Sequence, residues 1–168
     1  MISYETHVLP NSDYYVYTPS TLAHKLFFYP ICTGCFRYES GYRLARDSYD
    51  SFLLMYILKG TCFVTVDGQT RQAASGQLVL LDCYTPHAYG TDSGFEALWL
   101  HFDGPMARTF YETIVSEKGS LLYPTHPDAI RRSLYNIYDT FRNRAPIAED
   151  QISGTITNIL TDLLTAET

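Results

Sequence analysis

The residues best suited to hold a small molecule lie just past the middle of the chain. In the segment Trp99-Leu100-His101 the indole and the imidazole are two positions apart, and alternate residues of a strand point to the same face. Trp99 and His101 therefore share one face, while the aliphatic Leu98 and Leu100 share the other. An indole covers a flat apolar ring, and an imidazole donates or accepts a hydrogen bond. We expect the Trp99 face to line the interior of the fold and to form a pocket.

A second imidazole, His87, follows Pro86 in the loop after a strand that Gly76 opens. This order resembles the second half of the cupin signature, in which that histidine lies at the mouth of a β-barrel. Metal-dependent cupins add two histidines and a glutamate from an earlier strand pair, yet residues 50–73 contain neither residue type. A catalytic metal needs about three protein ligands. We therefore expect no metal site and no cofactor.

The four cysteines are Cys32, Cys35, Cys62 and Cys83. Cys32 and Cys35 form a single CxxC, without a second pair at zinc-ribbon spacing. Their neighbours form a β-rich apolar run rather than the strand-to-helix junction of a thioredoxin. We interpret all four as free structural thiols, with redox or metal use of the CxxC as the alternative.

The bulk composition limits the classes of partner. The 168 residues fit one domain with a helical appendage, and 15 tyrosines suit a strand-rich fold. The formal net charge is −6 and the longest basic cluster is Arg131-Arg132, whereas a nucleic-acid binder usually carries a basic patch. We expect no DNA contact by these residues. The start of the chain lacks the pattern of a signal peptide, and no apolar run reaches the length of a membrane span, so we expect a cytoplasmic protein.

The order of elements predicts a mainly β fold with C-terminal helices. Residues 1–23 contain many turn-forming residues and are expected to form an N-terminal arm. Residues 24–104 are expected to form a cupin-like antiparallel β-barrel of the jelly-roll type. The strand-like runs lie at 24–32, 52–58, 61–66, 69–73, 77–82 and 95–102. Between two of them, Asp67-Gly68 predicts a tight hairpin turn.

Residues 105–168 are expected to form a helical segment of two to three helices that dimerises the chain. Residues 106–117 suit a short helix, and Thr125 before Pro127 and Asp128 predicts the start of another. In the last segment an apolar stripe at helical spacing must be buried somewhere. Packing on its own barrel is one alternative, and an antiparallel helix pair across a dimer is the one that we favour. The stripe contains Ile152, Ile156, Ile159, Leu160 and Leu163.

Residues 24–168 resemble the sensory domain of AraC-family transcription regulators. The matching segments lie at 42–49, at 53–60 and at the Pro86-His87 turn, and the most specific is the ending Trp-Leu-His-Phe-Asp-Gly at 99–104. The resemblance implies a barrel that binds an effector, helices that form a homodimer, and a separate DNA-binding half with two helix-turn-helix motifs. We expect this chain to sense the effector and to leave DNA binding to that other domain.

The resemblance also implies the pocket residues. In the family's sugar-binding members an indole lies against the ligand, which corresponds to Trp99, and a tyrosine just past the Pro-His turn corresponds to Tyr89. His87 has the same parity as Tyr89. Arg46 best matches an arginine that would supply charged hydrogen bonds, with Arg43 second. Tyr15 or Tyr17 of the arm is the guess for a lid. For the pocket residues the alternatives are ordinary core positions, a backbone-bonded turn histidine, and arginines paired at the surface.

Three functions are compatible with this pattern. The first is a small-molecule sensor without enzymatic activity, with sugars among the candidate effectors. The second is a metal-independent cupin enzyme, such as a sugar epimerase or isomerase, with His87 or His101 as the general base. The third is a dimerisation module whose barrel is fully packed. A hollow interior beside Trp99 would separate the first two from the third.

Overall fold

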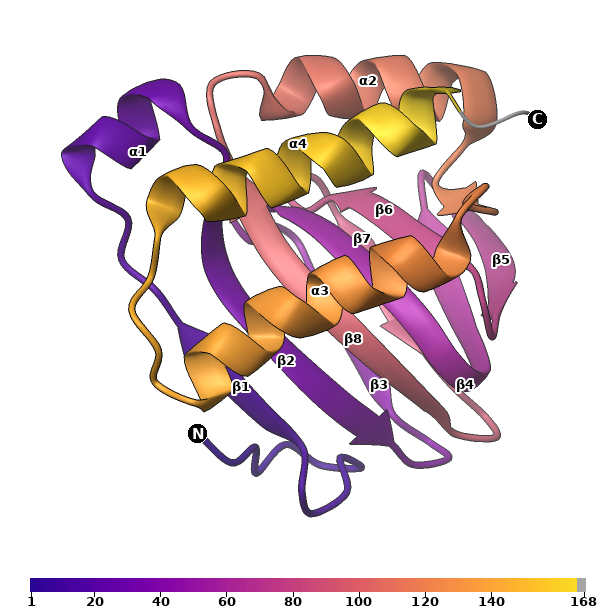
Figure 1. Ribbon diagram of the computed structural model, residues 1–168. Coiled ribbons are helices and arrows are strands. Elements are labelled where there is room, and N and C mark those ends of the chain that lie inside the picture. The colour runs from indigo at the N-terminus through magenta and orange to yellow at the C-terminus, as the bar shows by residue number, and fades with distance from the viewer. Residues whose placement is uncertain (166–168) are drawn as a thin grey trace.

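In the computed structural model residues 1–165 are described, and they form two antiparallel sheets and four helices (Figure 1). The first sheet contains, in spatial order, β1 (Asp13–Val16), β2 (Tyr29–Tyr38), β8 (Phe95–Asp103), β4 (Phe52–Val66), β6 (Leu78–Asp82) and β9 (Leu121–Leu122). The second sheet contains β3 (Arg43–Arg46), β7 (His87–Gly90), the far half of β4 and β5 (Gln69–Ala74). Among the described residues β3, β5 and β9 pair on one side only, and the outer side of β1 has only an isolated bridge from Ile2 to Asp13, so the predicted barrel is open at these edges.

The long strand β4 belongs to both sheets. Its first half pairs with β6 and β8, and its second half pairs with β5 and β7. The change occurs near Gly60, which has a φ of +76° and whose added Cβ would lie 2.3 Å from the carbonyl oxygen of Gly94. Only glycine fits such a close approach at positive φ. The sequence predicted two separate strands here, and the structure joins them into one.

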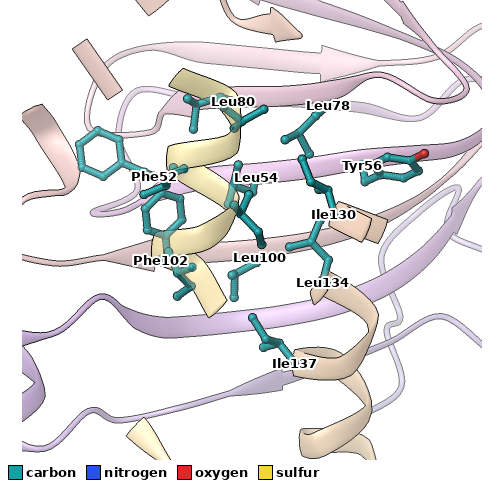
Figure 2. Close-up of a cluster of buried hydrophobic side chains, with 14 of the residues drawn as sticks. Phe52, Leu54, Tyr56, Leu78, Leu80, Leu100, Phe102, Ile130, Leu134 and Ile137 are labelled. Carbon is teal, nitrogen blue, oxygen red and sulfur yellow. The ribbon is translucent and has the colours of Figure 1, made fainter. Parts of the chain in front are cut away.

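Three helices cover the outer face of the first sheet: α2 (Ala107–Lys118), α3 (Pro127–Arg142) and α4 (Glu149–Thr165) (Figure 1). Figure 2 shows side chains of α3 meeting those of the strands beneath. In this cluster Phe52 and Leu54 of β4 and Leu100 of β8 are at most 1% exposed. Burial of this apolar surface fixes the helices on the sheet.

The apolar stripe of α4 is part of that same cluster. Its members are between 0% and 7% exposed within the single chain: Ile152, Ile156, Ile159, Leu160 and Leu163. Of the two alternatives for the stripe, the structure shows packing on the chain's own sheet. These five side chains are therefore not available to a partner helix, and a dimer would need the exposed side of α4.

A second cluster fills part of the space between the two sheets. In β8, Ala97 points into this space and Trp99 packs against it, whereas Leu98 and Leu100 point to the helices. The parity prediction for this strand is thus confirmed. Residues 52–57 are buried on both faces, which explains why the sequence there is an unbroken apolar run.

The predicted fold class, a mainly β antiparallel fold with C-terminal helices, is confirmed; α2, α3 and α4 follow β8, and the two-residue strand β9 lies between α2 and α3. Asp67 and Gly68 have φ values of 52° and 72°, as expected for the hairpin turn. The predicted helix start at Thr125 is wrong by one residue, because His126 is the N-cap and Pro127 the first residue of α3.

The predicted strand at 24–32 is wrong in its first part. Residues 24–26 belong to a short helix, α1 (Thr21–Leu26), and β2 begins at Tyr29. Ser20 starts the helix because its side chain accepts a hydrogen bond from the backbone N–H of Ala23. Within the predicted arm, β1 pairs with β2 as an edge strand. The division into arm, barrel and helical segment stays a prediction.

Candidate functional site

A cavity of about 480 Å³ lies between the sheets, beside the N-terminal arm. Half of the residues that line it are aromatic: Tyr4, Tyr14, Phe36, Tyr38, Tyr42, Tyr49, Tyr89 and Trp99. Polar side chains interrupt them at a few points: Ser3, Glu5, Cys32, Arg46 and His101. Apolar walls with a few converging polar groups are typical of small-molecule sites of this size.

The indole of Trp99 lies close to the backbone of the neighbouring strand β2. In the register of β2 and β8 it is opposite Gly34, and a Cβ added to Gly34 would lie 2.5 Å from Cζ2 of the indole. The ring of Phe36 meets the indole edge-on, with the ring centroids 5.1 Å apart. Nε1 of Trp99 is buried and has no hydrogen-bond partner among the described residues. The indole therefore forms one wall of the cavity and keeps an unused donor.

His101 lies next to Trp99 on the same face of β8 and is 4% exposed. Its Nδ1 is 2.8 Å from Oγ of Ser51, and its ring packs against that of Tyr49 with centroids 4.8 Å apart. Burial, followed by the positive charge of Arg46 and by His87, lowers the pKa of His101 from 6.5 to about 3. The imidazole is consequently neutral near pH 7, so it offers hydrogen bonds without charge.

The two candidate arginines point to opposite sides of β3. Arg46 lines the cavity, and its guanidinium carbon lies 4.6 Å from the centroid of the Tyr49 ring. Arg43 is exposed, forms an ion pair with Asp92 and donates to the carbonyl oxygen of Thr91 at 2.6 Å. The alternation of β3 separates them, because residues three apart in a strand face opposite ways.

The other two predicted pocket residues, Tyr89 and His87, do not line the same cavity. Tyr89 of β7 is 8% exposed and lines the cavity, and burial raises its pKa well above the ordinary value, so it stays a neutral phenol. His87 lies outside this cavity. Its Nδ1 is 2.8 Å from the carbonyl oxygen of Thr85, its buried Nε2 has no partner among the described residues, and it borders a neighbouring cavity that also touches Arg46. His87 thus matches the alternative of a turn histidine bonded to the backbone.

The arm contributes residues that the sequence did not point to. Ser3, Glu5 and Tyr14 line the cavity, and the guessed lid residues Tyr15 and Tyr17 do not. Tyr15 packs against Tyr138 of α3, and Tyr17 donates to the carboxylate of Glu149 at the start of α4. The alternation of residues 14–17 could have shown that these tyrosines divide between two faces, but not which face is the inner one.

The CxxC is not a disulfide. Cys32 faces the cavity, whereas Cys35, three residues along the same strand, packs on the helix side of the sheet. All four cysteines are free, and burial raises the pKa of Cys35 to about 11. Protonated, separated thiols agree with the interpretation as structural cysteines.

Among residues 1–165 no three His, Cys, Asp or Glu side chains come close enough together to hold a metal ion. None of the helices in this range has both the length and the apolar character needed to cross a membrane.

Solved structures provide several similar chains. A conserved protein of unknown function from Streptococcus pyogenes is 22% identical, with 60% of this chain and 77% of that chain covered and a TM-score of 0.45. The Cupin_2 domain of an XRE-family transcriptional regulator from Enterobacter cloacae is 17% identical, with 54% and 94% covered and a TM-score of 0.42. A cupin superfamily protein from Desulfitobacterium hafniense is 16% identical, with 54% and 76% covered and a TM-score of 0.41.

Among curated proteins no significant match was found. The family described as AraC-like ligand binding domain matches residues 32–153, which is well over half of the chain. The matched range includes all of the predicted pocket residues and the three helices up to the first turn of α4. The protein therefore belongs to the family of AraC-like ligand-binding domains.

Proposed function

We propose that this chain is the effector-sensing domain of an AraC-type transcription regulator in the cytoplasm, and that sugars are among its candidate effectors. The observation that carries the proposal is the cavity beside Trp99, which is walled by aromatic rings and reached by Arg46 and His101. A fully packed dimerisation module would have no such space. Membership in the AraC-like ligand-binding family supports the same function.

The N-terminal arm contacts the cavity on one side and helices α3 and α4 on the other, so it can couple the two. Tyr14 and Val16 of β1 face the cavity. On the other side of the strand, Tyr138 of α3 donates a hydrogen bond to Asp13, and Tyr17 donates to Glu149 of α4 at 3.0 Å. An effector that contacts Tyr14 would shift the equilibrium between arm positions, and the helices would pass this shift to a separate DNA-binding domain.

The net charge of the chain also supports the proposal that DNA is bound by a separate domain. With a net charge of −6 the chain lacks the basic balance of a DNA-binding module. We place the homodimer contact on the exposed side of the C-terminal helix, where Asn158 and Thr161 lie, since the apolar stripe is already buried.

A thermal-shift and calorimetric screen of sugars and small organic acids tests the sensing function. An effector should raise the melting temperature of the wild type by several degrees, because ligand binding stabilises only the folded state. Trp99→Ala should lose that response while keeping a folded circular dichroism spectrum. Tyr123→Ala, at a position that is 77% exposed, is the control and should respond as the wild type does. Equal responses from the wild type and Trp99→Ala would contradict the pocket.

A further inference from the structure

We propose that the effector carries a carboxylate on a six-membered ring and that Arg46 is the residue that anchors this group. The inference rests on the proposed sensing function and narrows it, because it separates acidic effectors from neutral sugars. The observation that supports it is that the guanidinium of Arg46 lines the aromatic cavity and has no ion-pair partner among the described residues.

Arg46 differs from three other arginines that border the two sheets; Arg71 of β5 also lacks an ion pair among the described residues, but it is exposed and does not line this cavity. Arg37 pairs with Glu96 at 3.0 Å, Arg108 pairs with Asp82 at 2.9 Å, and Arg43 pairs with Asp92. Arg46 forms no ion pair with any residue in the described range 1–165, although it is only partly exposed. Its contact is with the face of the Tyr49 ring. This stacking leaves the edge of the guanidinium, which bears the N–H donors, for another group.

The surroundings of Arg46 favour an anion over a neutral hydroxyl. Aromatic walls lower the local dielectric and so strengthen the interaction between opposite charges. The positive charge of Arg46 acts on His101 of the same cavity: after burial, it is the next cause that lowers the pKa of the His101 imidazole. A carboxylate accepts two parallel N–H bonds from a guanidinium and also neutralises its charge, whereas a sugar hydroxyl supplies only a hydrogen bond.

The other residues that line the cavity indicate which chemical groups the rest of the effector should carry. The indole of Trp99 and the rings of Phe36 and Tyr49 offer flat apolar faces that suit a six-membered ring. Glu5 of the arm lines the same cavity, and no ion pair joins it to Arg46. A carboxylate at this exposed position repels a second acid group and accepts a donor. The effector that fits carries its acid at the Arg46 end and a hydroxyl or amino donor at the Glu5 end.

The preference for a carboxylate can be tested by isothermal titration calorimetry on the whole chain, with acids compared with matched neutral compounds. The acids are 4-hydroxybenzoate and glucuronate, and their neutral counterparts are 4-hydroxybenzyl alcohol and glucose. We expect at least one acid to bind about tenfold or more tightly than its counterpart, since a charged hydrogen bond is worth at least one such factor. Arg46→Gln should remove this preference, and Glu5→Gln should strengthen the binding of the acid.

Arg43→Gln is the matched control, because it removes an arginine from the outer face of the same strand. It should leave the affinity for the acid unchanged. Tighter binding of the neutral members, or an unchanged preference in Arg46→Gln, would overturn the carboxylate assignment and leave the sensing function standing. If neither acid binds and neither changes the fluorescence of Trp99, the only tryptophan, the carboxylate assignment fails, whereas the sensing function fails only if the wider thermal-shift screen also finds no effector.

Discussion

The shape of the cavity depends on two residues that face each other across strands β2 and β8. Gly34 has no side chain, so the indole of Trp99 lies directly against the backbone of its neighbour. A glycine inside a strand weakens the strand, and it often marks a close approach of this kind. Gly34 thus positions the indole without itself touching an effector.

Gly34→Ala should push the indole into the cavity, because the new methyl group would lie 2.5 Å from Cζ2 of Trp99. We expect a loss of about 1–3 kcal/mol in the free energy of unfolding, a shifted emission maximum of Trp99, and a weaker thermal response to any effector. Gly154→Ala is the control. No atom lies within 4 Å of its added Cβ, and alanine should stabilise the exposed helix position by up to about 1 kcal/mol. Similar effects of the two variants would contradict the role of Gly34.

The neutral state of His101 makes the stability of the fold depend on pH. Its pKa is about 3 in the folded chain, against an ordinary value of 6.5. The unfolded chain therefore binds a proton below pH 6.5 that the folded chain does not. The stabilisation is fully present above about pH 6.5 and is lost progressively as the pH falls toward 3.

Urea unfolding between pH 6 and pH 4 should show this loss, with a slope of up to about 1.4 kcal/mol per pH unit from one proton. His101→Gln keeps a polar contact for Ser51 but cannot titrate, so its slope should be smaller by that amount. A slope that is the same in both proteins would show that His101 is already protonated in the fold.

At the scale of elements, one carboxylate joins α4 to the segment of the arm that follows β1. Glu149, the first residue of α4, accepts hydrogen bonds from the hydroxyl of Tyr17 at 3.0 Å and from the backbone N–H of Ser20 at 2.9 Å. The hydroxyl of Ser20 also donates to it. These bonds lower the pKa of Glu149, so the link persists above its lowered pKa and weakens as the pH falls through it.

Glu149→Ala should loosen the arm without unfolding the chain. The amides of residues 13–20 are expected to exchange their hydrogens severalfold faster, because the segment loses its bonds to α4. Asp150→Ala, the adjacent exposed acid, serves as the control and should leave these rates unchanged. Hydrogen exchange read by mass spectrometry measures both. Unchanged rates in Glu149→Ala would exclude this carboxylate as the connection.

Local patterns predicted several elements and missed others. The alternation in residues 95–102 and the Asp67-Gly68 turn are set by neighbours in sequence, so β8 and the β4–β5 hairpin could be predicted. Helix α1 was missed because six residues carry little periodic signal, and only the cap at Ser20 marks its start. The single strand β4 was missed because its continuity depends on the packing of Gly60 against Gly94.

At the scale of the whole molecule, the helical segment is held by the sheet of its own chain. Leu160 is 0% exposed in the cluster that joins α4 to the strands. Leu160→Ala should cost about 2–5 kcal/mol in the free energy of unfolding, the usual range for a buried leucine. Asn136→Ala, at an exposed position on α3, should change it by less than about 0.5 kcal/mol.

Urea denaturation at two protein concentrations measures both values and also addresses association. A loss for Leu160→Ala that is independent of concentration agrees with packing inside one chain. A loss that appears only at high concentration would instead indicate that this side chain stabilises a dimer.

The sequence by itself determined the fold class, the inner face of β8 and four of the residues that line the cavity: Arg46, Tyr89, Trp99 and His101. Strand parity and family motifs are local properties of the chain, so they can be read without coordinates. The tertiary structure decided that His87 turns to the backbone, that Arg43 faces outward, and that Ser3, Glu5 and Tyr14 line the cavity. It also decided that the stripe of α4 covers its own sheet. These outcomes depend on how segments far apart in sequence pack, and no local pattern carries that information.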